Sequence, residues 1–420
     1  MRKKIFCAIL TLTLAAGCKE KEKPLQADKL FADTEKMIIQ HYALRGTGED
    51  GPAFTIPELY GQALARFDEG KKTADRQELI DLLNKKHPDD RNSIYSALDA
   101  FLKALPVGYN NFARPESLKW LRDPDRSAGV GLVIRMTEPG RFLLLDSLEG
   151  SASHREKVPT GVYLDKVDGN AVGPMDMDEI VGRIRGPADS EVKLDIQGKT
   201  YTLVRSEVRF QNYLNASWEL PGGAKTEYIM LRSTLGGGQG QPGTASQLMA
   251  LVTSLGGRDS LILDLRKLHQ GDFDEAFKIA DLFVGGGRMG AIQMRGEPVR
   301  NFDADPDRVF SGRVFVIIGK NSSPFAETLA MAMSVSPETI LVGPEISASG
   351  FVAKALPVEG GVELRLTGGF ILNNQDKPLY QTGLHPSIST TDYLPSHPPL
   401  AEVDPADPAQ QKLGSMLGAK

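Results

Sequence analysis

The chain has 420 residues, enough for two or three domains, and its hydrophobic fraction of 41% is ordinary for a globular protein. Acidic residues (54) outnumber basic ones (49), which gives a net charge of -5. No cluster of lysine or arginine stands out after residue 23, so the chain lacks the basic field that nucleic-acid binding requires. We therefore expect no nucleic-acid partner.

The N-terminus has the pattern of an export signal followed by a tether. A basic start precedes an apolar run from Ile5 to Leu14, which is too short to span a bilayer, and small residues follow up to Cys18. This ending resembles a bacterial lipoprotein signal, although Ala15 stands where leucine is commoner. The resemblance implies removal of residues 1–17 and lipidation of Cys18. The charged stretch 18–26 predicts a solvated tether.

Localisation follows from this pattern. We expect a membrane lipoprotein of the cell envelope whose body faces the periplasm. Lys19, in place of an aspartate directly after Cys18, favours the outer membrane in an organism that has one.

Cysteine and histidine usage excludes several kinds of site. The only cysteines are Cys7, inside the signal, and Cys18, so the body has no thiol for a disulfide, a metal or a nucleophile. The six histidines show no ligand spacing such as HExxH. We expect neither a metal nor a cofactor.

Residues 27–125 predict a helical N-terminal domain. Apolar residues recur at helical spacing around Leu30, and again after Pro57, which is itself a favourable first residue of a helix. Two further helices are expected at Gln77–Lys86 and Ser93–Leu105. The many charges here are most simply a solvated face, because no catalytic pattern accompanies them.

Residues 126–210 change to short β-rich runs separated by glycine, proline and aspartate. A short helix is expected at Asp178–Ile184, and a hairpin at Glu191–Val204 that turns on Gln197-Gly198. With the opening Gly-Val-Gly-Leu, this order resembles a PDZ domain of the bacterial protease type. In such domains this loop presents backbone N–H groups to a peptide's terminal carboxylate, and the adjoining strand edge takes the peptide as an extra strand. The resemblance implies a peptide-binding site at Gly129, Val130, Gly131 and Leu132.

Residues 211–395 alternate apolar runs with helices, as expected for an α/β core. The glycine-rich loop Gly236–Gly243 has no lysine or hydroxyl at P-loop spacing, so we expect no phosphate site there. Residues 396–420 are assigned as a C-terminal tail. The other expected elements are strands at Tyr228–Leu231 and Ser260–Leu265, helices at Thr244–Leu255 and Asp274–Phe283, and a hairpin made by Val362–Leu366 and Phe370–Leu372.

The stretch Val314–Ala353 predicts a strand, a tight polar turn, a helix, a second strand and a loop. Hydrolases often hold a nucleophile at such a strand-to-helix turn. A simpler interpretation is that Ser323 caps the helix and Pro324 occupies its first position, so that the pair only starts a helix. Both interpretations stay open on these residues alone.

The whole order resembles the C-terminal processing (tail-specific) peptidase family. The resemblance implies a multidomain α+β protein with a helical N-terminal region, a PDZ-like β domain and a crotonase/ClpP-like α/β core. It covers nearly the whole chain after the signal. Its cues in the core are Leu261–Arg266, Ala326-Glu327, Leu341–Gly343, Leu366-Thr367 and Gly383–Pro386.

The residues that the family uses for catalysis are absent at the matching positions. Members of the family use a serine nucleophile, a lysine general base whose pKa is lowered by burial, and a supporting glutamine. Counted from Glu327 and from the strand at 341–343, these positions are Pro324, Ser349 and Ala353. Proline has no hydroxyl, and loss of a nucleophile costs on the order of a million-fold in turnover. The resemblance therefore implies a fold that has lost its chemistry.

Two arrangements could rescue activity. In the first, Ser322 or Ser323 would serve as a displaced nucleophile with Lys320 or Lys354 as base, but an exposed lysine stays protonated near neutral pH.

The second rescue is a serine-histidine arrangement using His269 or His385, and nothing in the sequence brings either near Ser349. His269 also falls in Lys267–Gly271. The family has an Asn-Pro-Gly-Gly loop at this place, which resembles an oxyanion hole, and that loop is altered in this sequence.

We expect a lipid-anchored, inactive relative of a peptidase that binds peptide or protein C-termini, or extended segments, through its PDZ-like domain. It would act as an adaptor or regulator, with an active protease as a possible partner. Its lipid anchor would attach it to the membrane. The alternatives are an active serine peptidase with a relocated Ser/Lys dyad, and binding of an apolar ligand in the vacated pocket.

Overall fold

A computed structural model describes thirteen segments of the chain, and the expected signal, Cys18 and most of the tether lie outside them. Within the described segments no helix combines the length and apolar character needed to cross a bilayer. The segments are residues 25–43, 54–67, 72–88, 90–108, 110–115, 118, 128–138, 140–208, 210–219, 225–238, 240–256, 258–395 and 402–418.

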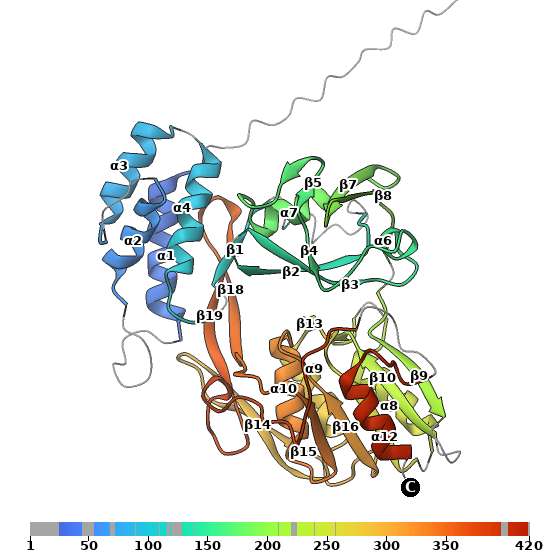
Figure 1. The fold of residues 1–420 in the computed structure, drawn as a ribbon. Helices are drawn as coiled ribbons and strands as arrows, with labels where there is room; N and C mark the ends of the chain where they lie inside the picture. Colours follow the sequence, from blue (N-terminus) through green and yellow to red (C-terminus); the bar gives the residue numbers. More distant parts are fainter. Residues whose placement is uncertain are drawn as a thin grey trace, which may run out of the picture.

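The N-terminal part is a group of four helices (Figure 1). Asp75 and Asp90 cap the third and fourth by accepting hydrogen bonds from backbone N–H groups of the first turn, which explains where these helices begin. The helices are α1 (Ala27–His41), α2 (Ile56–Ala65), α3 (Arg76–Lys86) and α4 (Arg91–Lys103).

The hydrophobic core of these helices is completed by a distant hairpin. Phe351, Leu356, Leu364 and Leu366 lie in the same buried cluster as the apolar faces of the four helices. They belong to β18 (Phe351–Pro357) and β19 (Glu363–Leu372), which run between the helices and the rest of the core (Figure 1).

The PDZ-like part contains two small sheets around one core. One has the order β2-β3-β4 and the other β6-β5-β7-β8. Gln197 and Gly198 turn the β7–β8 hairpin with positive φ values of 50° and 78°, as the sequence predicts. The elements are β2 (Leu132–Glu138), β3 (Arg141–Ser147), α6 (Ala152–Arg155), β4 (Val162–Tyr163), β5 (Lys166–Val167), β6 (Asn170–Ala171), α7 (Met177–Ile184), β7 (Glu191–Ile196) and β8 (Lys199–Val204).

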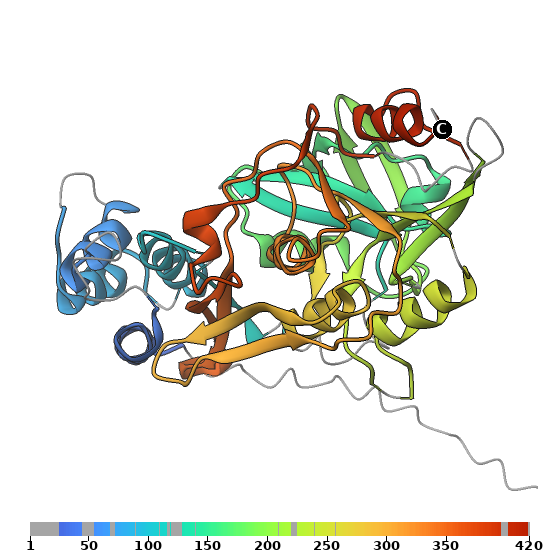
Figure 2. The same cartoon turned by 90° about the horizontal axis from the view of Figure 1, so that it is seen from below.

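A six-stranded sheet organises the core, in the order β20-β17-β16-β12-β10-β9. All its neighbouring strands are parallel except β9, which pairs antiparallel with β10. Helices lie on both faces, so the strands are nearly continuous apolar runs (Figure 2). The elements are β9 (Tyr213–Glu219), β10 (Lys225–Leu231), α8 (Thr244–Ser254), β12 (Ser260–Asp264), α9 (Phe273–Asp281), β16 (Arg313–Ile317), α10 (Pro324–Met333), β17 (Thr339–Gly343) and β20 (Ile388–Ser389).

The second core sheet corrects one prediction. The residues expected to form a hairpin, Val362–Leu366 and Phe370–Leu372, lie, apart from Val362, along the single strand β19, whose hairpin partner is β18. Gly369 is not a turn residue: a Cβ there would lie 2.3 Å from the carbonyl oxygen of Gln293 on the neighbouring strand. The sheet has the order β1-β19-β14-β15, with β18 on β19. The other elements are β1 (Asn111–Ala113), β11 (Ser233–Thr234), β13 (Gln270–Gly271), β14 (Gly287–Met294), β15 (Arg300–Ala304), η2 (Glu359–Gly361) and α11 (Leu379–Thr382).

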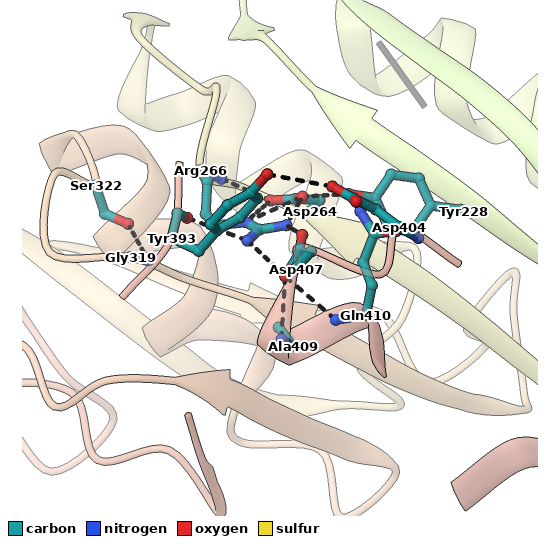
Figure 3. Close-up of polar contacts among 10 residues, drawn as sticks. All are labelled: Tyr228, Asp264, Arg266, Gly319, Ser322, Tyr393, Asp404, Asp407, Ala409 and Gln410. Atoms are coloured by element: carbon teal, nitrogen blue, oxygen red, sulfur yellow. Dashed lines mark hydrogen bonds and ion pairs between the residues drawn. The ribbon is translucent and has the colours of Figure 1, made fainter. Parts of the chain in front are cut away.

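The C-terminal stretch, expected to be a tail, contains α12 (Pro408–Gly418), which packs on the face of the sheet opposite α8, α9 and α10. A buried network ties it down (Figure 3). Arg266 Nη2 lies 2.6 Å from Asp264 Oδ2 and 2.5 Å from Asp407 Oδ2, and Asp407 accepts hydrogen bonds from the first N–H groups of the helix. The helix is therefore held by these polar contacts together with Ala409 and Leu413, which lie in a buried apolar cluster with the sheet.

Candidate functional site

The turn between β16 and α10 starts a helix, as the simpler interpretation of the sequence holds. Ser323 is the N-cap, and its Oγ accepts a hydrogen bond of 3.3 Å from the N–H of Ala326. Pro324 occupies the first helical position. Ser322 Oγ accepts from the N–H of Gly319 at 3.1 Å, which closes the turn (Figure 3).

Ser349 lies next to the same helix and is fully engaged. Its N–H and its hydroxyl both donate to Glu327 Oε2 at 2.9 Å, and the N–H of Gly350 donates to the same oxygen at 3.4 Å. Burial raises the pKa of Glu327, and these three hydrogen bonds partly offset that rise. The position expected to correspond to a lysine base is therefore occupied by a hydroxyl that supports a buried carboxyl group.

Pro324 and Ala353 line one cleft of about 850 Å³, so the structure brings these two predicted positions together. The aromatic residues Phe273, Phe325 and Phe351 line it as well. Such a cleft offers shape and apolar contact for a ligand, but Pro324 and Ala353 supply no reactive group to it.

The displaced serines have no base. Among the described residues, no lysine ammonium is hydrogen-bonded to a serine hydroxyl. Lys354 Nζ is paired with Glu297 at 2.9 Å, and Lys320 is exposed. His385 is also exposed, with a ring nitrogen 2.9 Å from the carbonyl oxygen of Thr382.

The loop after β12 holds a buried charge cluster that the sequence did not reveal. Lys267 Nζ donates to the carbonyl oxygen of Leu145 at 2.8 Å and to Asp146 Oδ1 at 3.0 Å. Arg232 donates to Asp146 Oδ2 at 2.6 Å. Burial lowers the pKa of Lys267, although Asp146 partly offsets the effect. The cluster joins the PDZ-like part, which supplies Asp146, to the core.

His269 lies in the same loop, and both of its ring nitrogens are buried without a hydrogen-bond partner among the described residues. Burial lowers its pKa to about 3, and Asp146 offsets only part of this shift. The ring is therefore neutral at neutral pH. No serine hydroxyl among the described residues is hydrogen-bonded to it, so these residues do not form the serine-histidine pair.

The predicted peptide-binding loop has free donors. The N–H groups of Val130 and Gly131 meet no acceptor among the described residues, whereas Gly129 exchanges backbone hydrogen bonds with Ser206. Leu132 begins β2, which pairs with β3 and has no strand on its other edge among the described residues. Gly131 has a φ of 80°, and a Cβ there would lie 2.1 Å from that of Ser151.

The PDZ-like part also contacts the turn between β16 and α10 directly. Arg135 on β2 donates to the carbonyl oxygen of Asn321 at 2.5 Å. Together with the cluster at Asp146, this bond fixes how the PDZ-like part is seated on the core.

The core belongs to a known class of peptidase domain. Residues 225–390 match the family described as peptidase family S41, so the chain carries the domain of a serine-type peptidase family. This match confirms the sequence-based recognition of the peptidase family. The structure also has the expected mixed α+β, multidomain fold.

Particular relatives are C-terminal processing proteases. The chain is 23% identical over 323 residues to the carboxy-terminal-processing protease of Bartonella bacilliformis, covering 73% of this chain and 72% of the relative. It is 22% identical over 324 residues to carboxy-terminal processing protease CtpA of Bacillus subtilis, covering 75% and 67%.

Two solved structures share the fold. The photosystem II D1 C-terminal processing protease superposes with a TM-score of 0.65 at 20% identity, over 94% of this chain and 98% of that chain. A putative S41 protease from Bacteroides fragilis gives a TM-score of 0.54 at 15% identity, over 92% and 97%.

Proposed function

We propose that this protein is a catalytically inactive relative of the C-terminal processing peptidases. It binds free peptide C-termini, or extended segments, through its PDZ-like part and acts as an adaptor or regulator, for example of an active protease. A lipid on Cys18 anchors it to the envelope membrane, most simply the outer membrane.

The engagement of Ser349 carries the proposal of inactivity. A lysine base must be buried, unpaired and close to a hydroxyl, and at this position a serine instead donates to Glu327. Pro324 has no nucleophilic atom, and the hydroxyls of Ser322 and Ser323 have no basic partner among the described residues. Nothing in this arrangement activates an attacking oxygen.

Covalent labelling with a fluorophosphonate separates the two classes of function. We expect no labelling of the purified protein under conditions in which an active serine peptidase is fully labelled. Labelling that is lost in Ser322→Ala or Ser323→Ala would instead establish the relocated nucleophile and end the proposal of inactivity.

Peptide binding is supported by the unpaired donors of the PDZ-like loop. The N–H groups of Val130 and Gly131 have no acceptor among the described residues, and a peptide carboxylate would supply one. The open edge of β2 continues from this loop, so a peptide chain has backbone groups with which to pair.

Titration of labelled peptides tests this site with a matched pair of variants. A free C-terminus should bind at least about tenfold more tightly than the same peptide with a C-terminal amide, because the amide removes the charge that the N–H groups recognise. Gly131→Ala should abolish the preference through the clash with Ser151, whereas Gly173→Ala, which lies outside the loop and whose Cβ meets no atom within 4 Å, should retain it. Equal binding of acid and amide would count against the proposal.

Lipid anchoring rests on the N-terminal residues alone and is tested in cells. Full-length protein should incorporate a labelled fatty acid and fractionate with membranes, and Cys18→Ala should lose both properties. Soluble, unlabelled protein that keeps Cys18 would contradict the anchor.

A further inference from the structure

A cavity of about 290 Å³ lies between the PDZ-like part and the core, away from the peptidase cleft. None of Pro324, Ser349 and Ala353 lines it, and neither does the loop at 129–132. The core contributes Leu214, Met230 and Arg232, and the PDZ-like part contributes Asp146, Ser147, Glu149, His154 and the segment 157–160. Its volume suits a small molecule rather than a folded partner.

The wall of this cavity carries a buried arginine with spare hydrogen-bonding capacity. The side chain of Arg232 is only 3% exposed. Its Nε and Nη2 both donate to Asp146 Oδ2, at 3.1 Å and 2.6 Å, while Nη1 has no acceptor among the described residues. A guanidinium normally uses its planar set of donors for carboxylates, so the free edge is a ready recognition group.

The charges around Arg232 do not balance. Asp146 is shared by two cations, because Lys267 Nζ also lies 3.0 Å from it. Glu149, the other acidic residue of the lining, is exposed, as is Lys157. An added anion beside Arg232 would therefore meet a buried surplus of positive charge.

A second polar atom of the lining is also unsatisfied. Thr160 Oγ1 is buried and has no hydrogen-bond partner among the described residues. The rest of the wall includes the apolar side chains of Val158, Pro159, Leu214 and Met230. The lining thus combines one cationic donor, one hydroxyl and an apolar surface.

We propose that this cavity binds a carboxylate carried on a short apolar group. The carboxylate would accept from Arg232 Nη1 and from the Thr160 hydroxyl, and the apolar group would lie against Leu214 and Met230. The carboxylate belongs either to a free small organic acid or to the last residue of a short peptide. Because both parts of the protein line the cavity, such a ligand would hold the PDZ-like part against the core.

The test uses sodium 4-methylpentanoate and the intact protein, measured by isothermal titration calorimetry and by thermal shift. We expect binding and a raised melting temperature. The neutral 4-methylpentanamide should bind at least about tenfold more weakly, because it cannot form the charge-assisted hydrogen bond to Arg232. Equal binding of acid and amide, or no binding of the acid, overturns the proposal.

Variants locate the binding without breaking the buried ion pairs. Leu214→Trp, which fills the cavity, should abolish binding, and Thr160→Val should weaken it about threefold or more. Leu235→Trp places the same bulk on an exposed residue outside the cavity and should leave binding unchanged. Binding that survives Leu214→Trp, or that is lost in Gly131→Ala instead, lies elsewhere and overturns the proposal.

The tripeptide Gly-Gly-Leu distinguishes the two sources. Binding of both the acid and the tripeptide, sensitive in each case to Leu214→Trp, assigns the site to peptide ends, whereas binding of the acid alone assigns it to free acids. Either outcome supports the cavity as a carboxylate site. The PDZ-like loop is tested by Gly131→Ala with longer peptides, so failure at one site is separable from failure at the other.

Discussion

The peptidase cleft and the PDZ-like loop differ in what they leave unpaired. Around α10, Ser349 and Gly350 donate to Glu327, and Ser323 caps the helix. In the loop, the N–H groups of Val130 and Gly131 meet no acceptor among the described residues. Both regions belong to one chain and one fold, but Glu327 engages the donors at positions 349 and 350, whereas the loop keeps two backbone donors without an acceptor among the described residues.

Under the proposed function, this difference bears on how a fold can lose its chemistry and keep its shape. Catalytic groups are held in costly states, with a buried base unpaired and a nucleophile exposed. On that proposal, Ser349 is a hydrogen-bonded group in place of a catalytic one, and its engagement with Glu327 avoids that cost. A binding loop cannot be satisfied in this way, because its donors are needed for the ligand.

Removing the carboxylate of Glu327, which accepts hydrogen bonds from Ser349 and Gly350, has the largest expected effect. Glu327→Ala leaves the N–H groups of half-buried Ser349 and buried Gly350 without their acceptor and should lower the free energy of unfolding by about 2–4 kcal/mol. Urea denaturation measures this. Glu345→Ala, which removes an exposed carboxylate, should change stability by less than about 0.5 kcal/mol. If both variants lose equally little stability, the hydrogen bonds to Glu327 do not stabilise this part of the core.

His269 predicts a pH dependence of intermediate size. Its pKa falls from an ordinary 6.5 to about 3 in the folded chain, so between these values only the unfolded chain binds the proton. The free energy of unfolding should therefore fall as the pH is lowered through this range, by about 2 kcal/mol from pH 7 to pH 5.

The variant His269→Phe isolates this contribution, because other titrating groups act equally in both proteins. Its stability should decline less between pH 7 and pH 5, by the same amount of about 2 kcal/mol. Parallel profiles for the two proteins would show that His269 is solvated in the folded chain.

Ser349→Ala has the smallest expected effect. It removes the hydroxyl bond to Glu327 but keeps the backbone bond, and should cost about 1 kcal/mol in urea denaturation. Peptide affinity should stay as in the unchanged protein. Ser347→Ala is the exposed control and should be neutral. A change in peptide affinity in Ser349→Ala would show that the cleft and the PDZ-like loop are energetically coupled.

Much of the fold could be predicted because its signals are local. The strand and helix around Ser323-Pro324 follow from an apolar run, a cap and a favoured first residue, and the β7–β8 hairpin follows from Gln197-Gly198. Position 369 misled the prediction. Its glycine is required by the close approach of Gln293 on β14, which no local pattern records.

The charge cluster at Asp146 could not be predicted for the same reason. Lys267 and Asp146 are 121 positions apart in the chain, and a lysine next to a strand end normally indicates an exposed residue. The helix α12 was missed likewise, because Asp407 pairs with Arg266 at a separation of 141. Isolated charged residues gave no sign that they meet in the interior.

The shared core of the N-terminal helices and the β18–β19 hairpin has a consequence for biosynthesis. The four helices are complete at Lys103, but part of the surface against which they pack arrives only with Phe351 to Leu366. A growing chain must therefore carry an unfinished apolar surface while most of the protein is still being made. A fragment that ends after the PDZ-like part would expose the same apolar surface. We therefore expect such a fragment to be soluble only when the β18–β19 hairpin is added.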